Sequence, residues 1–426
     1  MKKVISLFTA AALSLALFSG CASTKAPTST KYGKDSKVTI TYGLWDSNEE
    51  VGLKKVAQAF EKKNPNITIK FQLSSWANYW TMLDAAATGG TLPDTFWIHS
   101  NYIYKYTSNG MLHDLTSVIK QSKDVKLSNF PSGLTSIYNY KGKQYAVPKD
   151  YDTIGLWYNK TMFKKAGIKY PDSSWTWTTL YNAAKKLTDG KGHYGFLAPL
   201  KNQEGYYNFI YQNGGTVLKN SNGKKTSGYD DPKTIKAMDY YLSFVKNGLS
   251  PKVYDDLTPT TDMENGMVAM CMFGSWNISG FMSNSYMAKN CDVAVLPKSS
   301  DGKRATIFNG LGEAIAFNTK HFNESWKWVD YLSSKEGQLL EAKYGVAISA
   351  YNGTANEWTN ATKPFNSKIF IDQVKYAVIR PYSQTTGTWE DKSYEQLKGA
   401  WTGAKSVTQA CKDAAAAMNK ILATEK

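Results

Sequence analysis

The sequence is poor in the residues that most often carry metal or redox chemistry. It holds only four cysteines and four histidines in 426 residues. Setting aside Cys21, at the end of an export signal, leaves an odd number of cysteines, which rules out a complete disulfide framework. No histidine has a histidine or cysteine partner at metal-ligand spacing. Metal catalysis is therefore not expected, and no metal or other cofactor is predicted.

The remaining cysteines are Cys271, Cys291 and Cys411. Cys411 falls on the apolar face of a predicted helix and is expected to be a small buried side chain. Cys271 and Cys291 lie near two apolar segments that could form neighbouring strands. A disulfide between these two residues is therefore an open alternative to two free thiols.

Arginine is almost absent, since Arg304 and Arg380 are the only two. The formal net charge of +16 comes from lysines spread as single residues and pairs, with no run of five. Such spacing is typical of a solvated basic coat beside an acidic envelope. It argues against nucleic acid as a partner.

The sequence also lacks an apolar run long enough to span a membrane. Val4 to Phe18 is uncharged, but about 15 residues are too few where a spanning helix needs about 20. With Lys2 and Lys3 before it and Cys21 after it, the run predicts an export signal over residues 1–20. The stretch resembles the signal of bacterial lipoproteins, which implies lipid on Cys21 and anchoring on the extracytoplasmic face of the cell membrane. A plain secretory signal with an incidental cysteine is the alternative, because Phe18 stands where leucine is usual.

Residues 21–37 are rich in Ser, Thr, Lys and Pro and have no apolar period, so a flexible tether is expected. Apolar residues then alternate over 38–44, recur at helical spacing up to Asn64-Pro65, and alternate again over 67–73. This pattern predicts a βαβ unit and a parallel sheet.

Further helices are predicted from Asp231-Pro232 to Gly248, after residues 175–178, over 325–334 and over 406–422. Strands and helices alternate through most of the chain. The fold class is therefore α/β, with two lobes and a ligand cleft between them.

Several segments, in this order, resemble family 1 extracellular solute-binding proteins, the ligand receptors of ABC importers, a family that includes maltose-binding protein. They are TLPDTFWIHSNY (91–102), GKQYAVPKDYDTIGLWYNKTMFKKAGI (142–168), MVAMCMFGSW (267–276) and FNGLGEAIAFNT (308–319). The resemblance implies a two-lobed, type II periplasmic-binding-protein-like fold. Lobe 1 would comprise 38–148 plus 312–348, and lobe 2 would comprise 149–311 plus 349–426.

The same resemblance implies a monomer that captures a carbohydrate, most naturally an oligosaccharide, and delivers it to the transmembrane subunits of a permease without catalysis. A sugar presents flat C–H faces and a rim of hydroxyls, so its site needs exposed aromatic rings and fixed hydrogen-bonding groups. Trp276 ends an apolar strand after Gly274 and Ser275, which leave room for a ligand, and it is expected to be the main stacking platform. The resemblance adds Trp97, Tyr206 and Trp389 as stacking rings; core packing is the alternative for Trp97.

The family resemblance also implies which residues form hydrogen bonds to the sugar. The resemblance places Asp152 and Glu204 as hydroxyl acceptors, with Asp150 as the alternative to Asp152, and places Ser100 and Asn101 at ligand-contacting positions. Residues placed by topology are Trp45 and Asp46 after the first strand, and Trp76, Tyr79 and Trp80 after the second. Gly310, Gly312 and Glu313 precede a strand where the chain crosses between lobes. Glycines there suit either close approach of a ligand or a hinge, and Glu313 is a candidate ligand contact.

Three other functions are alternatives to this one. A secreted glycoside hydrolase needs two carboxylates about 5–10 Å apart, and Asp150, Asp152 and Glu204 are the acids that could provide them. A receptor for glycerol 3-phosphate, a polyamine or iron is a second rival, with Arg380 as a phosphate-binding candidate. An adhesion module is the third, but it leaves the predicted cleft unexplained. Tryptophan and tyrosine dominate the predicted rim, which favours a sugar of several rings.

Overall fold

The computed structural model describes residues 36–253 and 260–425. The expected export signal, the lipidation site Cys21 and the tether up to residue 35 lie outside the described residues. Across the two described ranges, no helix combines the length and the apolar character needed to cross a membrane.

The chain folds first into the predicted βαβ unit. Strand β1 (Val38–Leu44) pairs in parallel with β2 (Ile67–Leu73) over its full length, and helix α1 (Ser47–Lys63) connects them. The Asp46 side chain caps α1 by accepting hydrogen bonds from the backbone N–H groups of Asn48 and Glu49 at 2.7 and 3.3 Å. The helix ends at Asn64, before the proline, as expected.

The sheet of lobe 1 has five strands in the order β2-β1-β3-β14-β6, with β3 at Thr95–Ile98, β14 at Gly312–Ile315 and β6 at Ala146–Pro148. Strands β1, β2 and β3 are parallel as predicted, but β14 runs antiparallel to both β3 and β6. The predicted parallel pairing of the βαβ unit is confirmed, and the sheet as a whole is mixed. The reason is that β14 begins beside the end of β6, where the chain returns from lobe 2, so it enters the sheet in the opposite direction.

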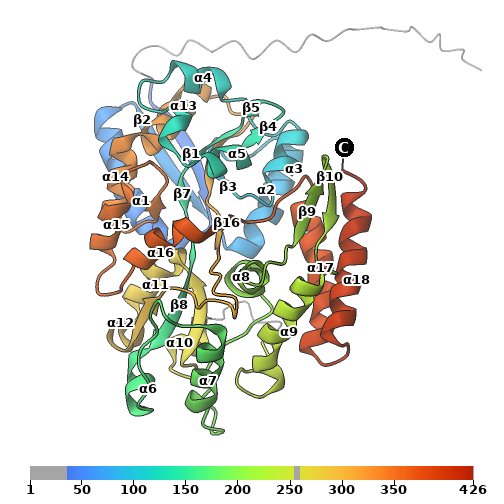
Figure 1. Ribbon diagram of the computed structural model, residues 1–426. Coiled ribbons are helices and arrows are strands. Elements are labelled where there is room, and N and C mark those ends of the chain that lie inside the picture. Colours follow the sequence, from blue (N-terminus) through green and yellow to red (C-terminus); the bar gives the residue numbers. More distant parts are fainter. Residues whose placement is uncertain (1–35, 254–259, 426) are drawn as a thin grey trace, which may run out of the picture.

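Helices of lobe 1 surround this sheet (Figure 1). They are α2 (Trp76–Gly89), α3 (Ile103–Ser108), α4 (Thr116–Gln121), α5 (Ser132–Ile137), α13 (Phe322–Ser333) and α14 (Lys335–Lys343). A small hairpin, β4 (Asn139–Tyr140) and β5 (Lys143–Gln144), and a short 3-10 turn, η1 (Leu127–Asn129), lie on the same lobe. The helix predicted over 325–334 corresponds to α13.

Lobe 2 is built on a three-stranded antiparallel sheet. Its central strand β8 (Ile154–Asn159) lies between β11 (Met270–Gly274) and β12 (Cys291–Ala294). Cys271 and Cys291 therefore stand on opposite sides of β8, two strand spacings of about 4.8 Å apart, which is too far for a disulfide. Both thiols are free and buried, and Cys411 is buried as predicted.

Most of the remaining helices pack around lobe 2. They are α6 (Lys160–Lys165), α7 (Trp177–Leu187), α8 (Tyr207–Gln212), α9 (Pro232–Lys246), α10 (Thr260–Glu264), α11 (Ile278–Ser283), α12 (Ser285–Asn290), α17 (Thr386–Trp401) and α18 (Val407–Leu422). Strands β9 (Leu218–Ser221) and β10 (Lys224–Ser227) form a hairpin. Asp231 caps α9 and Ser406 caps α18, at the predicted starts of both helices.

The chain crosses between the lobes at segments that lie side by side. Strand β7 (Asp150–Tyr151) pairs with β15 (Ile348–Ser349), and the next residue, Asp152, forms a bridge with Asn309. A Cβ on Gly310 would lie 2.1 Å from the carbonyl oxygen of Asp150. Glycine is needed here because two crossing backbones meet, which favours the hinge interpretation over close approach of a ligand.

Two short helices and a strand pair adjoin these crossings. Helix α15 (Ala355–Ala361) packs against α14, and α16 (Lys368–Asp372) packs against β8. The 3-10 turn η4 (Gln373–Tyr376) then leads into β16 (Ala377–Ile379), which pairs with β13 (Thr306–Phe308). The residue boundaries drawn for the two lobes from the sequence remain a prediction.

Candidate ligand-binding site

Trp276 lies in a short 3-10 turn, η3 (Ser275–Asn277), directly after β11. Its ring is half-buried and packs in part against the core of lobe 2. A Cβ on Gly274 would lie 1.9 Å from the ring atom Cζ3, so only glycine lets the indole rest over the backbone at this point. The sequence pattern Gly-Ser-Trp thus corresponds to a real packing requirement.

Glu204 meets the same turn from another part of lobe 2. It belongs to a single-turn π-helix, η2 (Asn202–Tyr206), and its Oε1 accepts a hydrogen bond from Asn277 Nδ2 at 3.2 Å. Burial raises the pKa of Glu204, while Lys201 and the bond from Asn277 oppose this shift. The structure therefore brings Glu204 next to Trp276. Asn277 is a site residue that sequence reasoning missed, although its place beside Trp276 was a signal.

Asp152 joins this group through Gln203. Gln203 Nε2 donates to Asp152 Oδ1 at 2.8 Å, which links the first crossing segment to the turn that holds Glu204. Burial, followed by the charge of Asp150, raises the pKa of Asp152 well above its usual value, and Gln203 and Arg380 partly oppose this. Gln203 was also missed, because nothing in its local sequence distinguishes it from a surface residue.

Lobe 1 contributes a cluster of aromatic rings. Trp45 contacts Trp76 and Tyr79 edge-on, each with ring centroids 5.0 Å apart. Trp80 stacks on Tyr102, with centroids 3.8 Å apart and an interplanar angle of 17°. Trp76 is 42% exposed, so it is the ring of this cluster that most readily offers a free face.

Trp76, Trp80 and Tyr102 line a groove of about 670 Å³ between α2, α3 and the start of α17. It combines aromatic faces from lobe 1 with amide, hydroxyl and carboxylate groups from lobe 2. The residues that matter most here are Trp76, Trp80, Tyr102, Gln384, Thr388 and Asp391. His99 connects this groove to the crossings, because its ring lies 5.3 Å from that of Trp76 and its Nε2 lies 2.8 Å from Asn309 Nδ2.

The structure buries three of the rings that were expected to stack on a sugar. Trp97 is 0% exposed and donates its indole N–H to the Tyr42 hydroxyl at 2.6 Å. Trp389 is also 0% exposed, on the buried face of α17, and donates to Ser383 Oγ at 2.8 Å. Tyr206 is 2% exposed and packs in the core of lobe 2. Each of these rings packs in the protein interior, so core packing is the role that the structure shows for them, and their contact with a sugar stays a prediction.

Two predicted ligand contacts on lobe 1 also have other roles. Ser100 is fully buried beside His99. Glu313 is fully buried as well, where its Oε1 accepts a hydrogen bond from the Tyr42 hydroxyl at 2.7 Å and burial raises its pKa to about 7. Both residues are part of the interior of lobe 1, so neither contacts a ligand from this position.

Three predicted polar contacts are engaged by the protein itself. Asp46 caps α1, as described above. Asp150 accepts from Lys149 Nζ at 2.7 Å and from the Leu311 backbone N–H at 2.8 Å, which leaves Asp152 as the better acceptor of the two alternatives. The Asn101 side chain bonds to Arg380 and Glu390 of lobe 2.

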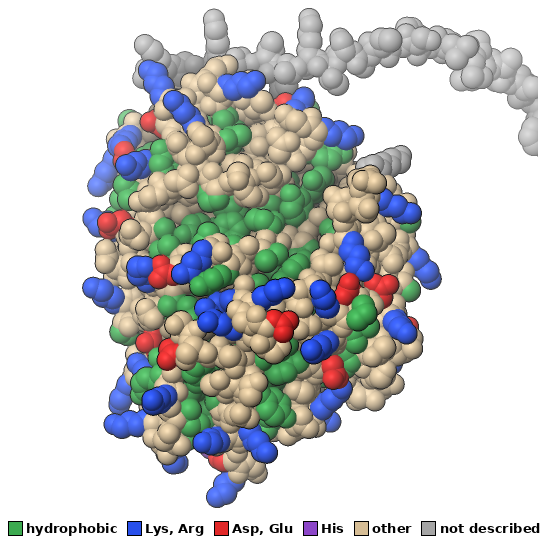
Figure 2. All heavy atoms as spheres, viewed as in Figure 1, with side chains coloured by type: hydrophobic (Ala, Val, Ile, Leu, Met, Phe, Trp, Pro, Cys, Tyr) green, Lys and Arg blue, Asp and Glu red, His purple; other side chains and the backbone are tan. Residues whose placement is uncertain are grey.

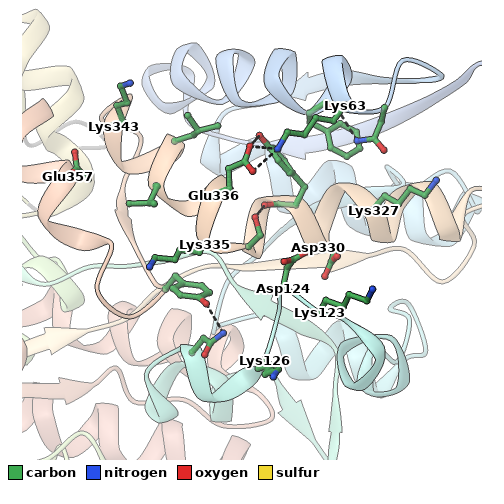
Figure 3. Close-up of a pocket in the computed structure, with 18 residues that line it drawn as sticks. Lys63, Lys123, Asp124, Lys126, Lys327, Asp330, Lys335, Glu336, Lys343 and Glu357 are labelled. Carbon is green, nitrogen blue, oxygen red and sulfur yellow. Dashed lines mark hydrogen bonds and ion pairs between the residues drawn. The ribbon is translucent and has the colours of Figure 1, made fainter.

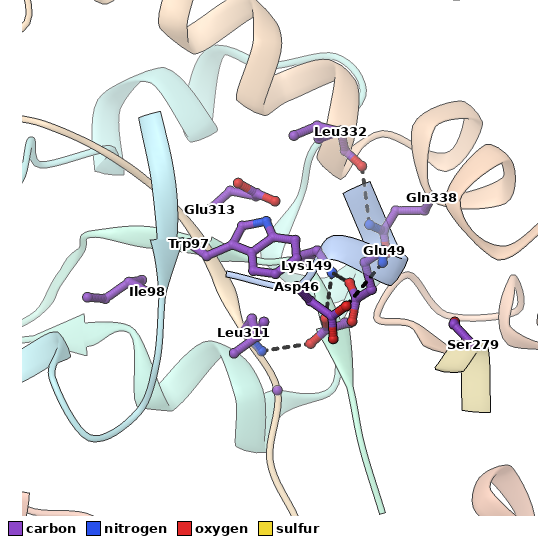
Figure 4. Close-up of polar contacts among 12 residues, drawn as sticks. Asp46, Glu49, Trp97, Ile98, Lys149, Ser279, Leu311, Glu313, Leu332 and Gln338 are labelled. Atoms are coloured by element: carbon purple, nitrogen blue, oxygen red, sulfur yellow. Dashed lines mark hydrogen bonds and ion pairs between the residues drawn. The ribbon is translucent and has the colours of Figure 1, made fainter. Parts of the chain in front are cut away.

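A buried ion-pair cluster lies beneath the crossings (Figure 4). Lys149, which is 0% exposed, donates to Glu49 Oε2 at 2.8 Å as well as to Asp150, and its Nζ lies 4.3 Å from the centroid of the Trp97 ring. Burial alone lowers the pKa of Lys149, but the charges of Asp150 and Glu49 outweigh it and hold the pKa well above its usual value. The cluster ties α1 of lobe 1 to the first crossing segment.

A larger groove, of about 1140 Å³, lies on the outer face of lobe 1 (Figure 3). Its charged lining residues are Lys63, Lys123, Asp124, Lys126, Lys327, Asp330, Lys335, Glu336, Lys343 and Glu357. It contains none of the residues predicted from the sequence, and Tyr351 in its wall is bonded to Asn129 at 2.8 Å. We therefore place the candidate site in the smaller groove and the crossings. Figure 2 shows Lys and Arg side chains scattered around the margin and over the lower half of one face of the molecule.

Residues 36–253 and 260–425 contain no group of three or more His, Cys, Asp or Glu side chains arranged to hold a metal ion. At the crossings, Asp152 and Glu204 accept hydrogen bonds from the side-chain amides of Gln203 and Asn277, and Glu390 is paired with the buried Arg380. This arrangement can orient a neutral ligand rich in hydroxyl groups.

Comparisons with known proteins identify the family of this chain. A family model for bacterial extracellular solute-binding proteins matches residues 46–339. The maltooligosaccharide ABC transporter solute-binding lipoprotein of Streptococcus pneumoniae is 26% identical over 429 residues, covering 97% of this chain and 96% of the relative. The multiple sugar-binding protein of Streptococcus mutans is 24% identical over 393 residues, covering 87% of this chain and 88% of the relative.

Among solved structures, an ABC substrate-binding protein from Listeria monocytogenes in complex with cycloalternan superposes with a TM-score of 0.84. It is 26% identical and covers 91% of this chain and 100% of its own. The agreement over nearly the whole chain confirms the two-lobed α/β fold predicted from the sequence.

Proposed function

The chain belongs to the bacterial extracellular solute-binding proteins, and on that premise we propose that it captures an oligosaccharide outside the cell membrane and delivers it to the permease of an ABC importer. The observation that carries the proposal is the pairing of aromatic and polar groups at the crossings. Half-buried Trp276 lies beside Glu204 and Asn277 on lobe 2, while Trp76 offers a ring on lobe 1. Rings on both lobes suit a ligand of several sugar units.

The state of the arginines supports a neutral ligand over a phosphorylated one. Arg380 is only 3% exposed and is paired with Glu390. Arg304 donates to the carbonyl oxygens of Leu296 and Ser173. Neither guanidinium is therefore free to bind a phosphate group bidentately, as a glycerol 3-phosphate receptor requires. The relatives named for sugars point in the same direction.

A thermal-shift screen against mono- and oligosaccharides tests the proposed ligand class. A ligand that binds only the folded protein adds about 2.7 kcal/mol of stability at 100 times its dissociation constant. We expect oligosaccharides to raise the melting temperature more than monosaccharides at equal concentration. A screen in which glycerol 3-phosphate or a polyamine shifts the melting temperature while no sugar does would contradict the proposal.

We predict that Asp152→Asn and Glu204→Gln each weaken sugar binding about three- to tenfold. The substitutions keep the shape of the side chain but remove the charge, and hydrogen bonds to charged acceptors are the stronger ones. Calorimetry with the sugar found in the screen measures the loss. Because burial raises both pKa values, lowering the pH should protonate the wild-type acids and narrow the gap between wild type and variants.

Asp239→Asn, an exposed acid on α9 paired with Lys246, is the matched control and should leave affinity unchanged. The same samples are checked for shortened products. If the wild type cleaves an oligosaccharide and Asp152→Asn stops the cleavage, the protein is a hydrolase and the receptor proposal is wrong.

We further propose that lipid on Cys21 alone holds the protein at the membrane. The tether contains no amphipathic face that could bind a bilayer by itself. In Cys21→Ser cells, fractionation should find the protein released from the membrane, with sugar affinity unchanged because none of the predicted ligand-binding residues belongs to the tether. Processed protein that stays on membranes through a high-salt wash would show that another element anchors it.

A further inference from the structure

The side chain of Asn101 reaches from one lobe to the other. Asn101 follows β3 of the lobe 1 sheet and precedes α3. Its Nδ2 donates to Glu390 Oε2 on α17 at 2.9 Å, and its Oδ1 accepts a hydrogen bond from Arg380 Nη1. The N–H donor and the oxygen acceptor of the Asn101 amide are thus both hydrogen-bonded to residues of lobe 2.

The two partners of Asn101 are held together within lobe 2. Arg380 Nη2 donates to Glu390 Oε1 and Oε2 at 2.6 and 2.7 Å, and the Tyr207 hydroxyl donates to the same carboxylate at 3.2 Å. The Arg380 backbone N–H donates to the Phe308 carbonyl at 2.9 Å, which fixes the arginine at the end of β16. All of these contacts lie inside lobe 2, so the Arg380–Glu390 pair does not need Asn101 to form.

The Arg380–Glu390 pair is complementary to only some types of side chain at position 101. A carboxylate oxygen and a guanidinium N–H lie next to each other, so a complementary side chain needs one donor and one acceptor side by side. A neutral primary amide has this arrangement. An aspartate at position 101 would repel Glu390, and a lysine would repel Arg380.

We propose that Asn101 is the lobe 1 half of a latch that closes on the preassembled Arg380–Glu390 pair and prolongs the closed state. The inference deepens the proposed function, since the latch would set how long a captured oligosaccharide is retained. It gives Asn101 a positioning role and replaces the direct ligand contact expected from the family resemblance. The expected effect is about tenfold on the closed-state lifetime, equivalent to about 1.4 kcal/mol.

Single-molecule FRET on the mature protein without ligand tests the latch. Dyes on Lys327→Cys, exposed on α13 of lobe 1, and Lys236→Cys, exposed on α9 of lobe 2, would report lobe separation. Asn101→Ala should shorten the closed dwell about tenfold, and Asn101→Asp should shorten it further. Asn247→Ala is the control, because that amide donates to the Tyr181 hydroxyl at 2.8 Å within lobe 2.

Stopped-flow dissociation of maltotriose is the second measurement. The latch predicts a rise of about tenfold in the dissociation rate for Asn101→Ala, with the association rate unchanged. An unchanged closed dwell in both Asn101 variants overturns the latch. Faster dissociation with an unchanged dwell overturns it too and makes Asn101 a ligand contact. If maltotriose does not bind the wild type, maltotriose is not the ligand of this protein. The FRET measurement does not need a ligand and still tests whether Asn101 acts as a latch.

Discussion

Lys149→Met is expected to lower the free energy of unfolding by about 3–5 kcal/mol at pH 8, the usual cost of removing one partner from a buried ion pair. Lys149 is the cation that the buried carboxylates Glu49 and Asp150 contact, at 2.8 and 2.7 Å. Two more buried acids, Glu313 and Glu341, also lie within its field. Without Lys149, these acids must be charged without compensation or take up a proton.

The loss should depend on pH in a defined direction. Burial already raises the pKa of Glu49, and Lys149 is the charge that opposes this shift, so the variant should have a still higher pKa at Glu49. An acid with a raised pKa in the folded protein binds more protons folded than unfolded. Its penalty is therefore absent below the unfolded value of about 4.3 and grows as the pH rises toward the folded value. The stability gap between wild type and variant should narrow from pH 8 to pH 5.

Urea unfolding at both pH values measures the two free energies. Lys246→Met is the matched control, since Lys246 pairs with Asp239 at 2.8 Å but both side chains are exposed, and exposed pairs contribute about 0–1 kcal/mol. If Lys149→Met lowers the free energy of unfolding by less than about 1 kcal/mol at pH 8, the buried ion-pair cluster does not stabilise the fold.

Trp276→Ala is expected to weaken sugar binding at least thirtyfold, because removal of a well-packed aromatic anchor typically costs about 2 kcal/mol or more. The ring rests over Gly274 and adjoins the pair of Asn277 and Glu204. Calorimetry on the folded variant measures the change. Tyr170→Ala, which removes a ring 42% exposed on another part of lobe 2, should leave affinity unchanged.

A second variant tests whether binding needs the Trp276 ring in its present position or only its presence in the protein. In Gly274→Ala the new Cβ would lie 1.9 Å from the indole, so the ring must move while remaining in the protein. Affinity should fall for this variant as well. If Trp276→Ala folds normally and loses less than threefold in affinity, Trp276 is not part of the site.

Sequence reasoning was most reliable where one short segment contains its own physical signal. The alternation over Val38–Leu44 and the stop at Asn64 predict β1 and α1 correctly, and Asp231 before Pro232 predicts the start of α9. It was less decisive where two neighbouring residues compete for the interior. Phe96 and Trp97 are both fully buried, so the structure shows for Trp97 the core packing that the sequence left open as the alternative to a stacking role.

The sequence by itself determined the first βαβ unit, several of the longer helices, the two-lobed fold class and the place of Trp276 after Gly274 and Ser275, because periodicity, caps and turns act within a few residues. Only the tertiary structure decided the direction of β14 and the separation of the two cysteines by β8. It also decided the partners of Lys149 and Asn101. Lys149 meets Glu49 across 100 residues, and Asn101 meets Glu390 across 289. Whether an acid forms an ion pair within the protein or is left to bind a ligand depends on contacts between segments that are far apart in the sequence. A local sequence pattern contains no information about such contacts.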